Sequence, residues 1–144
     1  MFLTSGCSHA LDLCIALLGS AGKNILIPKP GFPLYKTLCH GYGVETRSYN
    51  LDPSRGWEVD LSDLESLIDS NTVAIVYNNP SNPCGSVLNE DQIKSILNVA
   101  ERNHVPIIAD EIYENMVFSG EKFIPIASLT SHVPVLSCRG TTKK

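Results

Sequence analysis

The stretch VAIVYNNPSNPCG at residues 73–85 decides the fold of this 144-residue chain. Its first five residues, 73–77, are all apolar or aromatic, so they predict a strand buried on both faces rather than a strand with one face in solvent. A strand of this kind belongs to a parallel sheet that helices cover on both sides. The Asn and Pro residues at 78–85 then predict a loop at the carboxyl end of the strand.

Short apolar strands and amphipathic helices alternate along the rest of the chain. Further strands are predicted at residues 25–27, 44–49, 105–109 and 133–137. Helices are predicted at residues 8–18 and 33–40, after the N-cap Asp60, and after Asn89, which together with Gln92 resembles a variant of the capping box. The strand at 25–27 is expected to stop at Pro28. We therefore expect an α/β fold, a mostly parallel sheet with helices on both faces, whose strand order the pattern leaves open.

Composition limits the classes to which the protein can belong. A formal net charge of -4 with 11 Lys plus Arg argues against a nucleic-acid-binding protein, because no basic stripe is present to neutralise phosphates. No run approaches the roughly 18 apolar residues of a membrane helix, and no signal peptide is visible. Five cysteines without Cys-x-x-Cys spacing and four scattered histidines predict neither a disulfide framework nor a metal site. These features favour a cytoplasmic protein.

Polar residues follow the carboxyl ends of the predicted strands, which is where ligands bind in open parallel sheets. Residues 78–85 follow one strand, DEIY at 110–113 follows another, and residues 138–143, ending in GTTK, follow the last. The turn TSGCS at 4–8 opens the first predicted helix. Each segment alone has an ordinary explanation as a turn, a helix cap or a solvated tail. Their combination at one edge of a sheet predicts a ligand site.

These segments together resemble the class I aminotransferases, enzymes of fold type I that use pyridoxal 5'-phosphate (PLP). The segments NNPSNPCGSV at 78–87, TSGCSHA at 4–10 and PGFPLYK at 30–36 most resemble the subgroup that acts on tyrosine, whereas DEIY at 110–113 is shared more widely. The resemblance covers nearly the whole chain. It implies that residues 1–144 form part of the PLP-binding large domain, incomplete, without the small domain or the C-terminal part.

The resemblance implies a role for each matching residue around the cofactor ring. Asp110 is expected beneath the pyridine nitrogen, where pairing with the pyridinium would depress the pKa of the carboxyl group. Asn82 and Tyr113 are expected to donate hydrogen bonds to the phenolic oxygen, and Phe32 is expected to stack on the ring. Asp110, Tyr113 and Lys143 make up the expected catalytic group.

The resemblance also implies how the phosphate and the aldehyde of the cofactor are held. Gly6, Cys7 and Ser8 are expected to bind the phosphate at a helix N-terminus, where backbone amides and the helix dipole favour an anion. Lys143 is expected to hold the cofactor covalently and then to move a proton at the substrate α-carbon. The neighbouring Lys144 is the alternative to Lys143.

The resemblance implies transamination by the parent enzyme, a homodimer that converts L-tyrosine and 2-oxoglutarate to 4-hydroxyphenylpyruvate and glutamate. One alternative is another fold-type I PLP enzyme, such as a carbon–sulfur lyase or an aminotransferase for another amino acid, because residues that contact PLP do not select the substrate. The chain stops before the family's arginines for the cofactor phosphate and the substrate carboxylate. We therefore expect a fragment that is inactive alone, and a non-catalytic short product is the remaining alternative.

Overall fold

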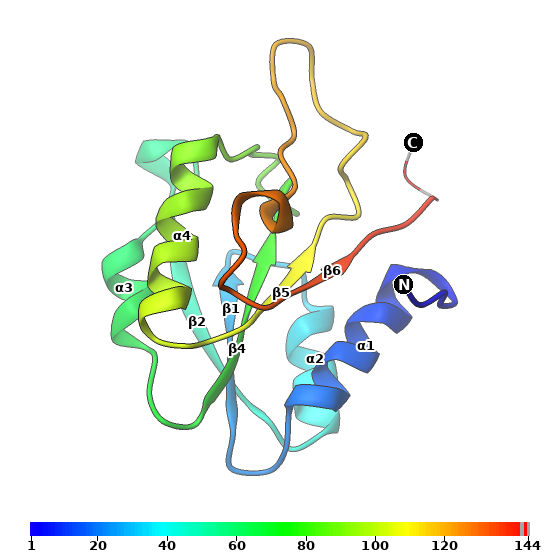
Figure 1. Cartoon of the computed structure of the whole chain (residues 1–144), viewed down its shortest axis with the longest axis vertical. Coiled ribbons are helices and arrows are strands. Elements are labelled where there is room, and N and C mark those ends of the chain that lie inside the picture. Colours follow the sequence, from blue (N-terminus) through cyan, green and yellow to red (C-terminus); the bar gives the residue numbers. More distant parts are fainter. Residues whose placement is uncertain (142, 144) are drawn as a thin grey trace.

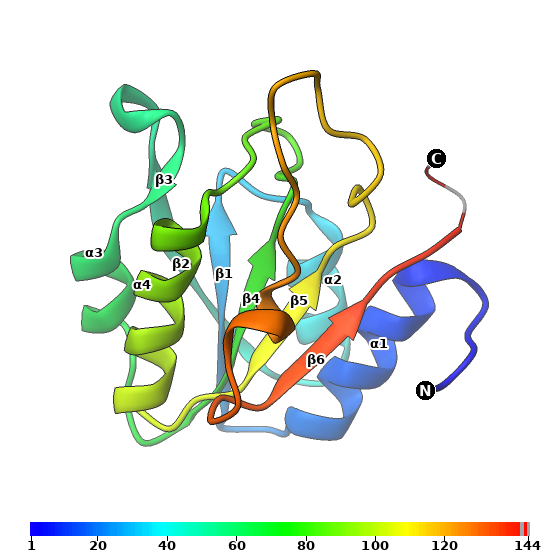
Figure 2. The same ribbon diagram turned by 45° about the horizontal axis from the view of Figure 1, so that its top comes forward.

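The computed structural model describes residues 1–141 and 143, and its centre is a six-stranded sheet in the order β3-β2-β1-β4-β5-β6. The strands are β1 (Asn24–Lys29), β2 (Glu45–Asp52), β3 (Glu58–Val59), β4 (Thr72–Asn78), β5 (Ile107–Asp110) and β6 (Val135–Cys138). Neighbouring strands are parallel, except that β2 and β3 are antiparallel. Figure 2 shows β1, β4, β5 and β6 side by side with their arrows pointing the same way, which confirms the predicted mostly parallel sheet.

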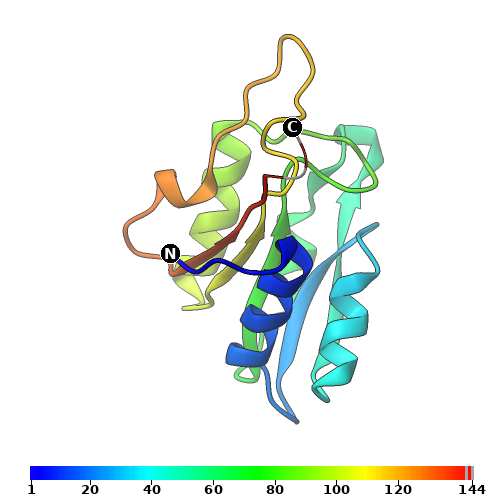
Figure 3. The same ribbon diagram turned by 90° about the vertical axis from the view of Figure 1, so that its right-hand side faces the viewer.

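Helices cover both faces of this sheet (Figures 1 and 3). The helices are α1 (Gly6–Leu18), α2 (Leu34–Gly41), α3 (Leu61–Ser66) and α4 (Glu90–Arg102), with two short 3₁₀ helices, η1 (Pro53–Arg55) and η2 (Ile126–Leu129). α1 and α2 pack on one face, and α3, α4 and η2 pack on the other. This arrangement confirms the predicted α/β class. In the described part of the chain, no helix combines the length and the apolar character that crossing a membrane requires.

Each face of the sheet has its own apolar cluster. Ile25 of β1 belongs to the cluster that contains Leu11 and Ile15 of α1. The next residue, Leu26, belongs to the opposite cluster with Ile93 of α4. Successive side chains of a strand point to opposite faces, so a strand covered on both sides must be apolar at every position. This burial explains why the central strands show no alternation of apolar and polar residues.

Prolines move the strand limits away from the predicted ones. β1 continues through Pro28 to Lys29, so the prediction that it stops at Pro28 is wrong. The pairing of β1 with β4 reaches only Leu26, so Pro28 lies beyond that ladder and its missing N–H is not needed there. β5 and β6 instead begin after Pro106 and Pro134, two residues later than predicted. A proline cannot donate to a ladder, so regular pairing starts only behind it.

β3 lies outside every predicted strand. The chain reverses between β2 and β3 through Gly56 and Trp57, which have φ angles of 66° and 67°. The backbone N–H of Trp57 donates to the carbonyl of Asp52 at 2.8 Å and closes the turn. A strand of two residues is too short to show an apolar period, so the sequence contains no signal for it.

The strand register brings the segments with polar residues to one edge of the sheet. Asn78, Asp110 and Cys138 are in register at the carboxyl ends of β4, β5 and β6. The loop after β4, the DEIY segment and the segment that leads to Lys143 therefore leave the sheet side by side. The N-terminus of α1 lies at the same edge, because the Cys7 thiol contacts Asp110.

The capping box predicted for the start of α4 is present in the structure. The side chain of Asn89 accepts from the backbone N–H of Gln92 at 3.0 Å, and the Gln92 side chain accepts from the N–H of Asn89 at 2.8 Å. Asn89→Ala should lower the free energy of unfolding by about 1 kcal/mol, because first-turn amides lose their acceptor. Urea denaturation followed by circular dichroism measures this. The exposed Glu101→Ala in the same helix is the control and should change stability by less than about 0.5 kcal/mol; equal losses would contradict the role of the cap.

Candidate active site

A cavity of about 310 Å³ lies at the carboxyl edge of the sheet; we call it the edge cavity. Its walls come from α1, the turn before α2, the loop after β4, the end of β5 with the residues that follow it, and the segment after β6. It is lined by Cys7, Ser8, Leu11, Phe32, Asn82, Asp110, Ile112, Tyr113 and Lys143. All the predicted site residues except Gly6 thus meet in one cavity. Gly6 is the first residue of α1 and precedes two of the lining residues directly.

The carboxylate of Asp110 is buried in the wall of the edge cavity, with 3% of the residue exposed. Its Oδ2 atom accepts the Tyr35 hydroxyl at 2.6 Å. Its Oδ1 atom accepts the backbone N–H of Ile112 at 3.3 Å and the Cys7 thiol at 3.6 Å. Burial raises the pKa of Asp110 above its ordinary value, while these three hydrogen bonds act in the opposite direction. Among the described residues, no basic side chain forms an ion pair with this carboxylate.

The surroundings of Asp110 fit a ligand with a cationic ring nitrogen. A buried carboxylate is unfavourable unless a cation or several donors compensate its charge. Within residues 1–141 and 143, the donors to Asp110 are all neutral, and a pyridinium nitrogen would supply the positive charge. The predicted depression of the Asp110 pKa refers to that paired form and stays a prediction, since burial raises the pKa in the protein alone.

Tyr35 of α2 is a residue of the site that the sequence analysis does not assign. It is 1% exposed, and its ring packs edge-on against Phe32, with centroids 5.8 Å apart and planes at 85°. Burial and the neighbouring carboxylate raise the pKa of Tyr35, so its hydroxyl remains a donor to Asp110. The sequence does contain a signal for Tyr35. It stands three residues after Phe32 near the start of a helix, and side chains with this spacing lie on the same face of a helix.

The loop after β4 places Asn82 at the edge cavity through its neighbour Asn78. The backbone N–H of Asn82 donates to Oδ1 of Asn78 at 2.7 Å, and Nδ2 of Asn78 donates to the carbonyl of Asp110 at 3.1 Å. Asn78 is buried and occupied by these bonds, whereas Asn82 lines the cavity. The two asparagines therefore differ in kind: one positions the loop, and the other is available to a ligand.

Lys143 and Tyr113 lie together at the mouth of the edge cavity. The Nζ atom of Lys143 is 5.6 Å from the centroid of the Tyr113 ring, a distance typical of a cation–π contact. The alternative lysine, Lys144, lies outside the described residues. The covalent role expected for Lys143 and the hydrogen-bonding role expected for Tyr113 stay predictions.

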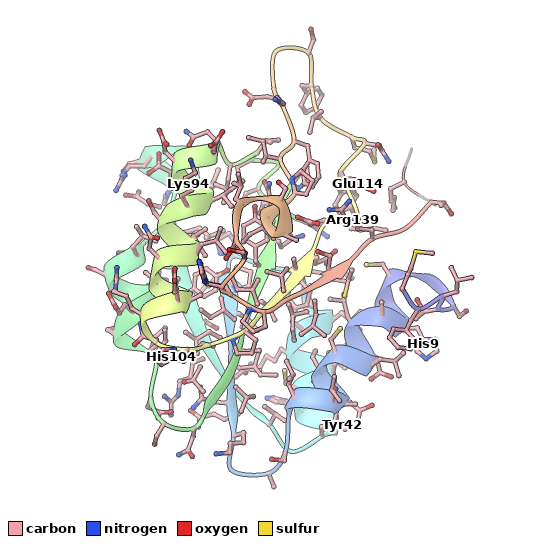
Figure 4. All side chains as sticks on the ribbon, in the orientation of Figure 1. His9, Tyr42, Lys94, His104, Glu114 and Arg139 are labelled. Carbon is pink, nitrogen blue, oxygen red and sulfur yellow. The ribbon has the colours of Figure 1, made fainter. Side chains whose placement is uncertain are left out.

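A second buried carboxylate follows Asp110 in sequence but lies outside the edge cavity. Glu111 is fully buried and forms an ion pair with Arg139 at 2.9 Å. Arg139 also pairs with Glu114 at 3.1 Å, and Figure 4 shows these two side chains close together. Arg139 is four residues before Lys143, so its ion pairs anchor the segment that carries the lysine.

The N-terminus of α1 borders the edge cavity. The first backbone N–H groups of a helix have no partner within the helix, and the helix dipole favours negative charge beside them. Cys7 and Ser8 stand in this first turn and line the cavity. Burial and the charge of Asp110 raise the pKa of the Cys7 thiol to about 12, so this thiol is neutral and does not repel an anion. The described residues contain no group of His, Cys, Asp or Glu suited to a metal ion.

Comparisons with known proteins agree with this geometry. The family described as aminotransferase class I and II matches residues 1–144. A tyrosine aminotransferase from Bos taurus is 56% identical over 144 residues, which are 100% of this chain and 32% of the relative. A solved tyrosine aminotransferase from Leishmania infantum has a TM-score of 0.94 and 43% identity, over 97% of this chain and 38% of its own. A PLP-bound structure from Clostridium difficile, described as an aminotransferase, has a TM-score of 0.90 and 26% identity, over 97% and 37% of the two chains. The chain spans about a third of the length of the curated relatives it matches.

Tyr35→Phe tests the hydrogen bond that holds Asp110. Removing the hydroxyl leaves a buried carboxylate with one donor fewer, so the free energy of unfolding at pH 7 should fall by about 1.5–3 kcal/mol. Tyr42→Phe is a matched control, because Tyr42 donates to Asp12 at 2.9 Å on the exposed surface (Figure 4). It should cost less than Tyr35→Phe, because solvent screens the exposed pair. Urea denaturation of both variants measures the difference, and a larger loss for the surface pair would refute the argument.

Asp110→Asn should stabilise the protein at pH 7 in the absence of a cofactor. Because the pKa of Asp110 is higher in the folded state than in the unfolded state, the folded protein binds the proton more tightly. Wild-type stability is therefore favoured at low pH and decreases as the pH rises through the folded pKa. The uncharged variant lacks this decrease, so its advantage should grow from pH 4.5 to pH 7. Urea denaturation across this range measures it, and an advantage that is larger at the acidic end would contradict the assignment.

Proposed function

The chain belongs to the class I and II aminotransferase family, and from this premise we propose that it forms part of the PLP-binding large domain of an aromatic aminotransferase. The observation that supports the proposal most strongly is the meeting of Asp110, Asn82, Tyr113 and Lys143 in one cavity. The 56% identity to a tyrosine aminotransferase favours L-tyrosine and 2-oxoglutarate as substrates. Because the chain spans about a third of its curated relatives, this activity is proposed for the whole protein.

The residues of the edge cavity match the parts of PLP one by one. When bound, PLP supplies an electron sink for the bond that breaks at the substrate α-carbon. Asp110, held by Tyr35, would stabilise a positive charge on the ring nitrogen. Phe32 offers an aromatic face to the ring, and Asn82 and Tyr113 offer hydrogen-bond donors to its phenolic oxygen.

The phosphate and the reactive carbon of PLP would be held by two other elements. The first turn of α1, with Gly6, Cys7 and Ser8, would bind the phosphate through backbone amides and the Ser8 hydroxyl. Lys143 would hold the cofactor covalently and then accept the proton that leaves the substrate α-carbon and deliver it to the carbonyl carbon of the cofactor. The ion pair of Arg139 with Glu111 keeps this lysine's segment at the end of β6.

Three further features belong to the same proposal. The substrates of the whole protein would be an amino acid and a 2-oxo acid, and its assembly would be a homodimer. A cytoplasmic location fits the cysteines, all five of which are free thiols in the structure. A carbon–sulfur lyase on the same scaffold is the alternative, and no contact in the edge cavity favours it.

Covalent trapping tests the assignment of Lys143. The chain is incubated with PLP, reduced with borohydride, digested and analysed by mass spectrometry. We expect the reduced cofactor on Lys143 in the wild type and in Lys144→Ala, and its loss in Lys143→Ala. Label that persists in Lys143→Ala, or that resides on Lys144, would overturn the assignment of this residue.

An assay of amino transfer tests the proposed activity in the protein that carries this chain. We expect 4-hydroxyphenylpyruvate from L-tyrosine and 2-oxoglutarate, and a decrease of kcat by about 10²–10⁴-fold in Lys143→Ala. Release of a thiol from an S-substituted cysteine, without formation of 4-hydroxyphenylpyruvate from tyrosine, would instead establish the lyase. Absence of both products would refute the proposed enzyme class.

A further inference from the structure

Three of the five cysteines lie along the contact between α1 and the carboxyl end of β5 and β6. Cys14 of α1 and Cys138 of β6 have their Sγ atoms 3.7 Å apart, although 124 positions separate them in the sequence. Cys7 belongs to the same apolar cluster but directs its thiol to Asp110 at 3.6 Å. Cys39 is buried in α2, and Cys84 lies in the loop after β4. The proposed cofactor chemistry uses neither thiol of the Cys14–Cys138 pair.

Geometry selects Cys138 as the partner of Cys14. A disulfide has an S–S length of about 2.05 Å, so the two side chains or their elements must close a gap of roughly 1.6 Å. Cys7 and Cys14 share α1 but stand seven residues apart, which is roughly 10.5 Å along a helix. Two cysteines whose Cα atoms are more than about 7 Å apart cannot be bridged without backbone movement. Among the described residues, Cys138 is the one thiol within hydrogen-bonding distance of Cys14.

A groove next to β6, which we call the thiol groove, borders the pair. It has a volume of about 610 Å³ and lies apart from the edge cavity. Cys14 and Cys138 both line it, together with Leu13 and Leu17 of α1 and Val135 of β6. Cys14 is half-buried and Cys138 is buried, so Cys14 is the thiol that meets an oxidant first.

The electrostatics of the two thiols give them different roles. The hydrogen bond between the sulfurs lowers the pKa of Cys14, whereas the same bond, together with burial, raises the pKa of Cys138. Burial and the charge of Asp110 raise the pKa of the third thiol, Cys7, to about 12. Cys14 is the more exposed thiol of the pair, and the thiolate is the nucleophilic form of cysteine, so Cys14 is the attacking group, whereas the raised pKa of Cys7 makes that thiol less reactive.

We propose that Cys14 and Cys138 form a redox modification site that hydrogen peroxide converts to an intramolecular disulfide. In the first step the Cys14 thiolate attacks one peroxide oxygen; an S–O bond forms, the O–O bond breaks, and the hydroxide takes up a proton to leave as water. In the second step the Cys138 sulfur attacks the Cys14 sulfenic acid; the S–S bond forms, the S–O bond breaks, and the proton of Cys138 leaves with the hydroxide as a second water. Two electrons pass from the sulfurs to the peroxide.

The disulfide would join two elements that both lead to the edge cavity. α1 carries Cys7 and Ser8 at its N-terminus, and β6 is followed by the segment that ends in Lys143. The bond would also close a loop of nearly the whole chain, and the restriction of the unfolded state grows slowly with loop length. Oxidation should therefore change the stability of the chain as well as its thiol content.

Peptide mapping of the oxidised chain tests the proposal. The reduced protein is treated with equimolar hydrogen peroxide at pH 7, the remaining thiols are blocked with N-ethylmaleimide in denaturant, and the chain is digested with trypsin. Cleavage after Lys23, Lys122 and Arg139 places Cys14 in peptide 1–23 and Cys138 in peptide 123–139. We expect these two peptides to be joined, with the loss of two of the five free thiols.

Variants and an unfolded control assign the bond. Because Cys7 shares peptide 1–23 with Cys14, Cys7→Ser should retain the link and Cys14→Ser should abolish it, while Cys84→Ser serves as a further control that retains it. Oxidation in urea should lower the yield of this link at least about tenfold, because the native approach of the sulfurs is lost. A link that survives in Cys14→Ser, a link to peptides 37–47 or 56–94 in its place, an equal yield in urea, or five free thiols after treatment would each overturn the proposal.

Discussion

The burial of a charged carboxylate at the end of β5 constrains the whole carboxyl edge of the sheet. Asp110 is held by a hydroxyl from α2, a thiol from α1 and a backbone amide from its own segment. Each of these donors requires its element to lie close to the sheet end, so the packing of α1 and α2 and the shape of the edge cavity depend on one another. Neutral donors compensate the charge only in part, which leaves Asp110 suited to a cationic ligand atom.

Two neighbouring carboxylates at the end of β5 have different roles, one structural and one suited to a ligand. Asp110 is the last residue of β5, where it contacts α1 and α2, whereas the next residue, Glu111, accepts the backbone N–H of Ile126 in η2 on the other side of the sheet. Glu111 is neutralised inside the protein by Arg139, whereas Asp110 receives hydrogen bonds without a cation. The carboxylate of Glu111 therefore anchors the chain on one side of the sheet, and the carboxylate of Asp110 remains available to a ligand on the other.

α1 connects three parts of the site. Its N-terminus borders the edge cavity, its apolar face covers β5 and β6, and its Cys14 approaches Cys138 at the sheet edge. All three contacts thus depend on the position of one helix. The thiol groove and the edge cavity are separate spaces, but this helix forms a wall of both.

The sequence by itself determined the α/β class and the cap at Asn89, and its resemblance to known segments named most of the residues that line the edge cavity, though not Leu11 or Ile112. Local periodicity, capping patterns and matching segments can be recognised in residues that are close together in the sequence. It carried no signal for the two-residue strand β3 and placed the end of β1 wrongly at Pro28. Only the tertiary structure decided the strand order, the hydrogen bond from Tyr35 to Asp110, the pairing of Arg139 with Glu111 and the approach of Cys14 to Cys138. The partners in these contacts stand 28 to 124 positions apart, and side chains so distant in sequence meet only after the sheet has fixed their register.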